Sequence, residues 1–273
     1  MTQRAASLAE RVGRATNRLL LLLGCIVIFL PLVLTLYLSL FNEQMIVFPP
    51  HGYTFAWYGQ IAGKFGGAIW TSLRIALAAV AFSLLIGIPA GIGLSRYRFR
   101  GRDALGTFLL SPLTIPGIAT GLAIYVLAVW IEEQIGLELA GSIRLLIMAH
   151  VLITMPWVVR LCLASLTNHE RTTEEAASSL GASPLMVLLR VTLPAMRPGI
   201  VAAALFAFIV SFENLELNLF LVAPGLTTLP VAVLQYLQYH IDPLVAAVAV
   251  AQIAIVGAAL AVLDRFVQLG RVL

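Results

Sequence analysis

The sequence predicts an all-α polytopic membrane protein with about six transmembrane helices. Hydrophobic residues make up 60% of the 273 positions and charged residues only 11%, whereas soluble domains carry about 25% charged residues. The mean hydropathy of +0.98 is too high for a soluble core. The net charge of +4 comes from basic residues that flank the apolar runs. We therefore interpret the basic residues as topology signals and expect no nucleic-acid partner.

Six apolar runs are each long enough to cross a bilayer, which takes about 20 helical residues. The predicted spans are Leu19–Phe41, Ile69–Leu94, Phe108–Ile131, Ile143–Leu166, Gly199–Val222 and Leu244–Phe266. Prolines occur inside several of them, including Pro112 and Pro116 in the third span. Packed membrane helices tolerate proline because neighbouring groups satisfy the freed carbonyl oxygens, so the prolines predict kinks.

The orientation follows from the basic residues, because cytoplasmic segments carry an excess of Lys and Arg. Of the 17 basic residues, 14 lie on one side of the predicted spans. The three on the other side are Lys64, Arg74 and Arg144. This distribution predicts cytoplasmic tails at residues 1–18 and 267–273 and a cytoplasmic segment at 167–198. No small-residue cleavage site follows the first span, so we expect an uncleaved anchor helix at 19–41 rather than a signal peptide.

The first outer segment, residues 42–68, contains Phe55, Trp57, Tyr58 and Phe65. These aromatic side chains fit two arrangements. The segment either packs along the outer surface of the protein, or it forms part of an interfacial aromatic belt.

The core of five spans covers residues 69–266 and includes a further outer segment at 223–243. The apolar stretch from Thr227 to Tyr239 is too short and too polar to be a seventh span. We expect a helix or a re-entrant piece that lies at the outer face.

The cytoplasmic segment has the pattern of two short helices joined at a glycine. Thr172 and Thr173 precede Glu174 and Glu175, which predicts a threonine N-cap with acidic residues in the first turn. Gly181 supplies the left-handed conformation that ends many helices.

A second helix follows this glycine. Ser183 and Pro184 form an N-cap and N1 pair, and the apolar stretch Leu185–Val191 continues from them. We expect this helix to stop ahead of Pro194, since proline disfavours helical conformation at the residue before it.

The same segment carries an ordered set of motif residues: Glu175-Ala176-Ala177, Gly181-Ala182, Val191, Leu193-Pro194, Pro198 and Ile200. In order and spacing it resembles the EAA loop of the membrane subunits of binding-protein-dependent ATP-binding cassette (ABC) importers, with Val191 where isoleucine is more usual. In that family the loop docks into the ATPase subunit. The resemblance implies an ABC importer type I permease bundle whose ATPase-coupling residues are Glu174, Glu175, Ala176, Ala177, Gly181, Ala182, Leu193 and Pro194.

Acidic residues inside a span cost about 3 kcal/mol on insertion scales and mark pathways by default. The fifth predicted span contains Glu213 and Glu216, which share one face of a continuous helix with Phe220 beyond them. Two carboxylates and an aromatic ring suit a cationic amine. Alternatively, Glu216 is interfacial and Glu213 pairs with Arg74, Arg144 or His150. His150 itself is expected to be a packed or paired histidine.

A narrower resemblance concerns the cargo. Residues 211–214, the Pro224-Gly225 pair and the Thr227–Val231 stretch resemble the spermidine/putrescine branch of these permeases, specifically the shorter subunit of the pair. The branch has an acidic pair where this chain has Glu213 and Asn214. The resemblance therefore implies a polyamine path that includes Glu213, Asn214, Glu216 and Phe220, with opines and aminoalkyl phosphonates as alternative cargoes.

No catalytic, metal or cofactor motif occurs in the chain: we find no Walker glycine loop, HExxH, Cys-x-x-Cys or nucleophile elbow. Cys25 and Cys162 lie in separate apolar runs and form no disulfide or zinc pattern. We expect a non-enzymatic subunit that binds no cofactor.

The resemblance implies a multi-pass protein of the bacterial inner membrane with several partners. These are a two-copy ATPase carrying ATP and Mg²⁺, a second permease subunit that is either identical or a related chain, and a periplasmic binding protein. A stand-alone secondary carrier with Glu213 as its cation site is the alternative. Inverted repeats would favour such a carrier, and we find none in the sequence.

Overall fold

The computed structural model describes residues 2–44, 47–167 and 171–267. Within these residues the regular structure is helical, apart from two isolated β-bridges. The chain divides into two compact units, Met1–Gly63 with Leu237–Ala254 and Lys64–Tyr236 with Ile255–Leu273. The all-α prediction is confirmed.

The first helix, α1 (Thr2–Leu38), starts earlier than the predicted span at Leu19. The expected tail at 1–18 is therefore helical from Thr2 onward. Its apolar part, Gly13–Leu38, is long and apolar enough to cross a membrane. After α1 the chain turns back on itself, since the Asn42 N–H donates to the Gly52 carbonyl oxygen over 3.1 Å.

The second helix, α2 (Ala56–Arg96), also starts earlier than predicted and takes up half of the expected outer segment. Trp57 is 8% exposed, and its indole Nε1–H donates to the Phe41 carbonyl oxygen over 2.7 Å. Phe65 is 2% exposed and packs edge-on against Tyr236 at 5.5 Å. For these two residues the packed arrangement is correct and the aromatic belt is wrong, whereas Phe55 is exposed.

The predicted third span, Phe108–Ile131, begins too early, because the chain breaks at its prolines and the membrane-length helix is Gly117–Ile135. Helix α3 (Arg102–Leu110) is followed by the 3₁₀ turn η1 (Ser111–Thr114), and α4 (Gly117–Ile135) begins after Pro116. Ile115 is extended, with φ −93° and ψ 132°, because the following proline disfavours the α region.

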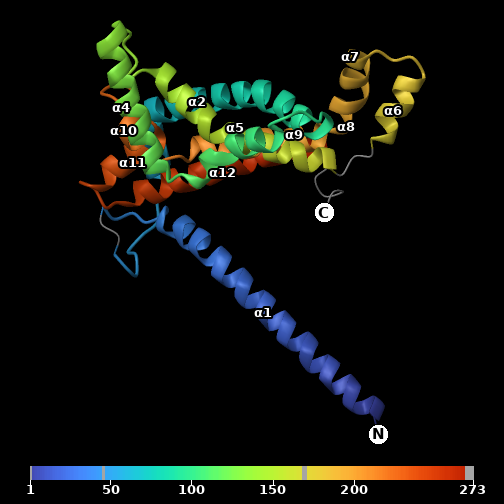
Figure 1. Cartoon of the computed structure of the whole chain (residues 1–273). Helices are drawn as coiled ribbons and strands as arrows, with labels where there is room; N and C mark the ends of the chain where they lie inside the picture. Colours follow the sequence, from blue (N-terminus) through green and yellow to red (C-terminus); the bar gives the residue numbers. More distant parts are fainter. Residues whose placement is uncertain (1, 45–46, 168–170, 268–273) are drawn as a thin grey trace. The chain divides into compact units, whose positions relative to one another are not determined.

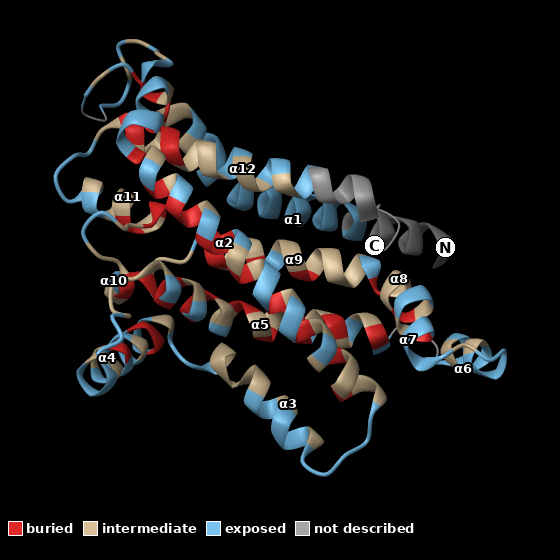
Figure 2. Cartoon of the chain, turned by 90° about the horizontal axis from the view of Figure 1, so that it is seen from above, coloured by how far each residue is buried: buried red, intermediate tan, exposed pale blue. Residues whose placement is uncertain are grey.

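Helix α5 (Ile143–Thr167) matches the fourth predicted span and carries many buried residues, as Figure 2 shows. It packs against α2 and against α9 (Arg197–Phe212). A Cβ added at Gly87 of α2 would lie 2.7 Å from a Val158 methyl carbon, and one added at Gly91 would lie 2.9 Å from Cys162 Cβ. Small residues allow this close approach, which drives helix association in lipid.

Five helices of the described residues are long and apolar enough to cross a membrane. A sixth span results if Pro184–Ala195 and Arg197–Phe212, bent by 67° at their junction, are counted together. Helix α12 (Pro243–Val267) covers the last predicted span, and α11 (Leu229–Leu237) confirms the helix expected within 223–243.

The two ends of the larger unit carry different features. Figure 1 shows α6 (Thr172–Ser179) and α7 (Pro184–Val187) at the opposite end from α4 and α10 (Asn218–Leu221). Helices α5 and α9 run between these ends. A movement at one end can therefore reach the other through the packed α5–α9 pair.

The glycine contacts predict a difference between two neighbouring alanine substitutions in α2. Gly91→Ala should destabilise the protein by about 1–3 kcal/mol, since an added Cβ overpacks the contact with Cys162. Gly93→Ala should be neutral or stabilising by up to about 1 kcal/mol, because no atom lies within 4 Å of its added Cβ. Thermal unfolding in detergent, followed by circular dichroism, measures both. Equal midpoints for the two variants would contradict the packing argument.

Candidate coupling loop and translocation segment

The predicted glycine corner of the cytoplasmic segment is present between α6 and α7. Gly181 has φ +88°, and the Ala182 N–H donates to the Ala177 carbonyl oxygen over 3.1 Å, which closes a Schellman turn. Ser183 then caps α7 by accepting from the Met186 N–H over 3.4 Å. Both of these predicted features are confirmed.

The predicted threonine cap is wrong. Helix α6 begins at Thr172, and the residue before it is Arg171 in the αR conformation with no side-chain cap. Both threonines are therefore helical residues. Glu174 and Glu175 lie in the first turn as expected, where carboxylates complement the positive end of the helix dipole.

The predicted stop ahead of Pro194 is also wrong, because the backbone stays helical through the proline. A π-helical stretch, η2 (Leu188–Thr192), follows α7, and α8 (Leu193–Ala195) contains Pro194. A proline ring in an α-helix clashes with the carbonyl four residues earlier. The wider π turn changes the hydrogen-bonding register ahead of Pro194, which accommodates the ring at the bend before α9.

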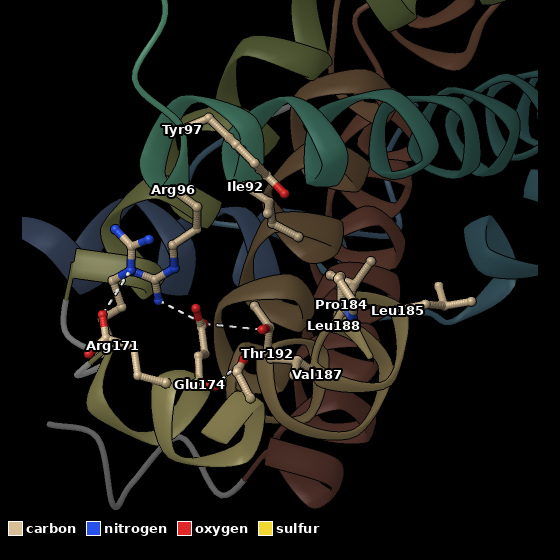
Figure 3. Close-up of a pocket in the computed structure, with 12 residues that line it drawn as sticks. Ile92, Arg96, Tyr97, Arg171, Glu174, Pro184, Leu185, Val187, Leu188 and Thr192 are labelled. Carbon is tan, nitrogen blue, oxygen red and sulfur yellow. Dashed lines mark hydrogen bonds and ion pairs between the residues drawn. The ribbon is translucent and has the colours of Figure 1, made fainter. Parts of the chain in front are cut away.

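The two adjacent glutamates of α6 have different surroundings, as Figure 3 illustrates for Glu174. The Glu174 carboxylate is 18% exposed, accepts from Arg96 Nη2 at 2.9 Å and accepts from the Thr192 hydroxyl at 3.1 Å. The Glu175 side chain is 65% exposed, and its carboxylate lies 3.4 Å from Nε of Arg171, the residue before the helix. Glu174 therefore points inward, and Glu175 is free to face a partner surface.

Apolar side chains are exposed on the same corner. Leu180 is 89% exposed, Leu185 63% and Leu189 54%. Aliphatic residues at a helix corner, next to an exposed glutamate, form a surface suited to a protein partner rather than to water. A pocket of about 500 Å³ lies between the end of α2 and this corner, with Arg96, Tyr97 and Glu174 in its lining.

At the other end, the fifth predicted span, Gly199–Val222, is interrupted. Helix α9 ends at Phe212, residues 213–217 are not helical, and α10 starts at Asn218. The predicted shared helical face of Glu213 and Glu216 is therefore wrong. Both glutamates are exposed on the interrupted segment.

Asparagine side chains stabilise this interruption by hydrogen-bonding to nearby backbone groups. Asn214 Oδ1 accepts from the Leu217 N–H over 3.0 Å, and Asn218 Nδ2 donates to the Asn214 carbonyl oxygen over 2.6 Å. Such local bonds compete with helical ones. Asn214, predicted on the substrate path, thus supports the turn, and Phe220 lies partly buried on α10.

His150 links α5 to both sides of the interruption. Its Nε2 lies 3.0 Å from Asn218 Oδ1, and its Nδ1 lies 2.7 Å from Ser211 Oγ. Since Asn218 presents its oxygen, Nε2 carries the proton and Nδ1 accepts from the Ser211 hydroxyl. The side chain is 1% exposed, which confirms the expected packed histidine. Sequence reasoning did not connect it with residues 61 and 68 positions further on.

Two glycines of α4 bring that helix close to the interruption. A Cβ at Gly117 would lie 2.5 Å from Glu216 Oε2, and one at Gly121 would lie 2.7 Å from the Leu217 carbonyl oxygen. At Gly121 the close atom belongs to the backbone, so only glycine allows the approach, whereas at Gly117 it is the end of a flexible side chain. The pair, spaced four residues apart, is the small-xxx-small signal that points to this contact. The Glu216 carboxylate thus lies beside the first turn of α4.

Among the described residues, no group of His, Cys, Asp and Glu side chains is arranged to hold a metal ion. The arrangement offers two features instead. One is a corner with exposed apolar residues and Glu175. The other is an interrupted helix with exposed carboxylates.

Comparison with known proteins identifies a family. The model of the family described as "Binding-protein-dependent transport system inner membrane component" matches residues 83–269. The putrescine transport system permease protein PotI of Escherichia coli K12 is 32% identical over 241 residues, which cover 87% of this chain and 85% of PotI. The provisionally named 2-aminoethylphosphonate transport system permease protein PhnV of Salmonella paratyphi A is 32% identical over 206 residues, covering 75% and 76%.

Solved structures show the same fold at lower identity. A chain of a bacterial ABC transporter involved in the import of the acidic polysaccharide alginate superposes with a TM-score of 0.72 at 18% identity, covering 94% of this chain and 97% of that one. A chain of the MetNI methionine ABC transporter in an inward-facing conformation gives 0.62 at 21% identity, covering 76% and 96%.

The conformation of Gly181 predicts unequal effects of two substitutions of similar size. Gly181→Val should destabilise the corner by about 1–2 kcal/mol, because a β-branched residue is strained at positive φ. Gly181→Asn should be tolerated, since asparagine adopts the left-handed conformation more readily. Hydrogen exchange of the amides from Leu180 to Met186 measures the difference. Equally fast exchange in both variants would contradict this explanation.

Proposed function

Since the chain belongs to the family of binding-protein-dependent transport system inner membrane components, and is a permease subunit of an ABC importer, we propose that it transports a cationic amine such as putrescine or spermidine. It is a multi-pass protein of the inner membrane. The observation that carries the cargo proposal is the exposure of Glu213 and Glu216 on the interrupted span, together with the named cargo of the putrescine permease relative.

The cargo proposal rests on the energetics of charge in membranes. An acidic side chain at membrane depth is costly unless it faces a partner or a water-filled path. Non-helical backbone is likewise tolerated only where it is buried in protein or lines such a path. Residues 213–217 combine both features. Carboxylates there would attract a diamine and let it pass by exchange between sites, with Phe220 adding a cation–π contact.

The coupling end supports docking to a separate ATPase subunit. Glu175 and the leucines around Gly181 are exposed on the α6–α7 corner. We propose that this corner fits a cleft in one copy of a two-copy ATPase, which holds ATP and Mg²⁺, while this chain carries no catalytic group. The remaining motif residues support the corner. Ala176 and Ala177 accept the hydrogen bonds that end α6, and Leu193 and Pro194 form the bend toward α9.

The proposed assembly places two permease subunits side by side with the path between them. The second is a related chain or a copy of this one, and a periplasmic binding protein delivers the cargo. Both termini and the α6–α7 corner are cytoplasmic in this proposal, in line with the excess of basic residues on that side.

In the proposed cycle, ATP closes the ATPase dimer and moves the α6–α7 corner of each permease. The bent junction before α9 and the packed α5–α9 pair carry this movement to the interruption at 213–217. The path then opens to the outside, where the binding protein releases its cargo, and hydrolysis resets the assembly.

Other cargoes remain distinct outcomes of the same proposal. PhnV carries a name that refers to an aminoalkyl phosphonate, which shares the amine with polyamines, and opines are a further class. A stand-alone secondary carrier using Glu213 would leave the exposed corner at Gly181 without a role.

Neutralising one carboxylate tests the cargo proposal. Glu213→Gln should lower ATP-dependent uptake of labelled putrescine at low concentration by about tenfold or more, because a lost charge-assisted contact costs about 1.5 kcal/mol. Uptake is measured in cells that express the ATPase, both permeases and the binding protein.

Glu138→Gln is the matched control, since it removes an exposed carboxylate from the loop after α4 and should leave uptake unchanged. Assembly of the complex is checked by co-purification. Wild-type uptake that is insensitive to Glu213→Gln would make Glu213 structural. An assembled complex without polyamine uptake would redirect the cargo to aminoalkyl phosphonates and opines.

A further inference from the structure

We propose that Arg96, the last residue of α2, is a positioning residue that ties the coupling corner to α2, so that ATP-driven movement of α6 also moves this helix. The inference rests on the proposed coupling to an ATPase. It assigns a role to a residue outside the EAA segment, whose charge otherwise only marks topology.

The contact joins three elements that are distant in the sequence. The Arg96 guanidinium donates to Glu174 Oε1 over 2.9 Å, and the same oxygen accepts from the Thr192 hydroxyl over 3.1 Å. Figure 3 shows Arg96 from α2, Glu174 from α6 and Thr192 from η2 converging on this point. A single carboxylate oxygen thus connects a predicted membrane helix, the coupling helix and the π-helical stretch before α9.

Burial makes this contact stronger than an ordinary surface pair. The Arg96 and Glu174 side chains are 14% and 18% exposed, whereas those of the neighbouring Arg171–Glu175 pair are 62% and 65% exposed. Water screens the attraction between the exposed Arg171 and Glu175 side chains, so this pair contributes little free energy. The first pair is shielded, so separating its charges is costly and the two helices are held to move together.

The two adjacent glutamates of α6 have different roles in this proposal. The Glu175 side chain is 65% exposed beside Arg171 and is accessible to a partner, while Glu174 is 18% exposed and is bound to Arg96 of α2. A force applied to α6 at Glu175 therefore reaches Arg96 through the neighbouring residue Glu174. The α9 bend receives it through Thr192, which is 5% exposed.

The test follows movement at the end of α2 and does not depend on the cargo. A fluorescent bimane label is placed on Arg98→Cys, an exposed position two residues beyond Arg96, in a Cys25→Ala background; the other cysteine, Cys162, is buried. The full complex with its ATPase, second permease and binding protein is reconstituted in lipid nanodiscs. The emission change on adding ATP and vanadate is recorded together with ATP hydrolysis.

The decisive variant is the double substitution Arg96→Gln with Glu174→Gln, which removes both charges and leaves neither one buried alone. We expect the complex to assemble and hydrolyse ATP, with the label response reduced by about fivefold or more. The charge exchange Arg96→Glu with Glu174→Arg should restore much of the response. The single substitution Arg100→Gln removes an exposed charge from the same segment and should change nothing.

Each outcome bears on the inference. An unchanged label response in the double variant overturns it, and so does a response that Arg100→Gln lowers equally. If the double variant does not assemble, the milder Glu174→Gln variant decides, because a response at the wild-type level there leaves Arg96 with a purely structural role. A wild-type permease that binds no ATPase subunit contradicts the proposed function instead.

Discussion

The close approach of α5 to its two neighbours is the constraint on which the larger unit depends. Lipid gives helices no hydrophobic reason to associate, so they are held by packing of small residues and by hydrogen bonds. Gly87 and Gly91 allow α2 to approach α5 so closely that an added Cβ would clash with α5 side chains. Ser83 and Thr154 share a buried 2.7 Å hydrogen bond between the same two helices. Gly199 plays the corresponding part where α9 meets α5. Interiors packed this tightly deform little. We therefore expect α5 to behave as one rigid element between the α6–α7 corner and the interrupted span.

The interruption at residues 213–217 packs near α5, and nearby side chains satisfy hydrogen bonds of its backbone. Hydrocarbon offers no hydrogen bonds, so a break inside a span needs local partners. The side chains of Asn214 and Asn218 provide these partners within the segment. His150 of α5 hydrogen-bonds to Asn218, and Gly121 of α4 leaves room for the Leu217 carbonyl oxygen. The polar side chains in this stretch therefore serve two purposes. The amides and the imidazole build the turn, and the carboxylates of the same turn stay exposed.

The sequence was sufficient for the elements that depend on local chemistry. Length and hydropathy located most of the spans, and the left-handed glycine at 181 with the Ser183 cap followed from rules that involve only a few neighbouring residues. It was insufficient where tertiary contacts decide. Pro116 was expected to kink a helix and instead directly precedes the start of α4, and the helix expected to run through Glu213 stops at Phe212. The burial of Glu174 depends on Arg96, which is 78 residues away, and no local pattern contains that information.

This division between local and distant determinants explains why the EAA segment is readable as a motif while its connection to the bundle is not. In the proposed assembly the corner at Gly181 docks onto a separate ATPase subunit, so its shape has to be specified by its own short sequence. The link from the corner to the membrane helices is internal, so any residue that reaches Glu174 from within can serve. In this chain that residue is the terminal arginine of α2, whose long side chain spans the gap between the helix end and α6. A positive charge at the cytoplasmic end of a membrane helix is already favoured by topology. In the proposed mechanism, burying this charge against Glu174 of α6 adds a mechanical connection at a position where topology already favours a positive charge.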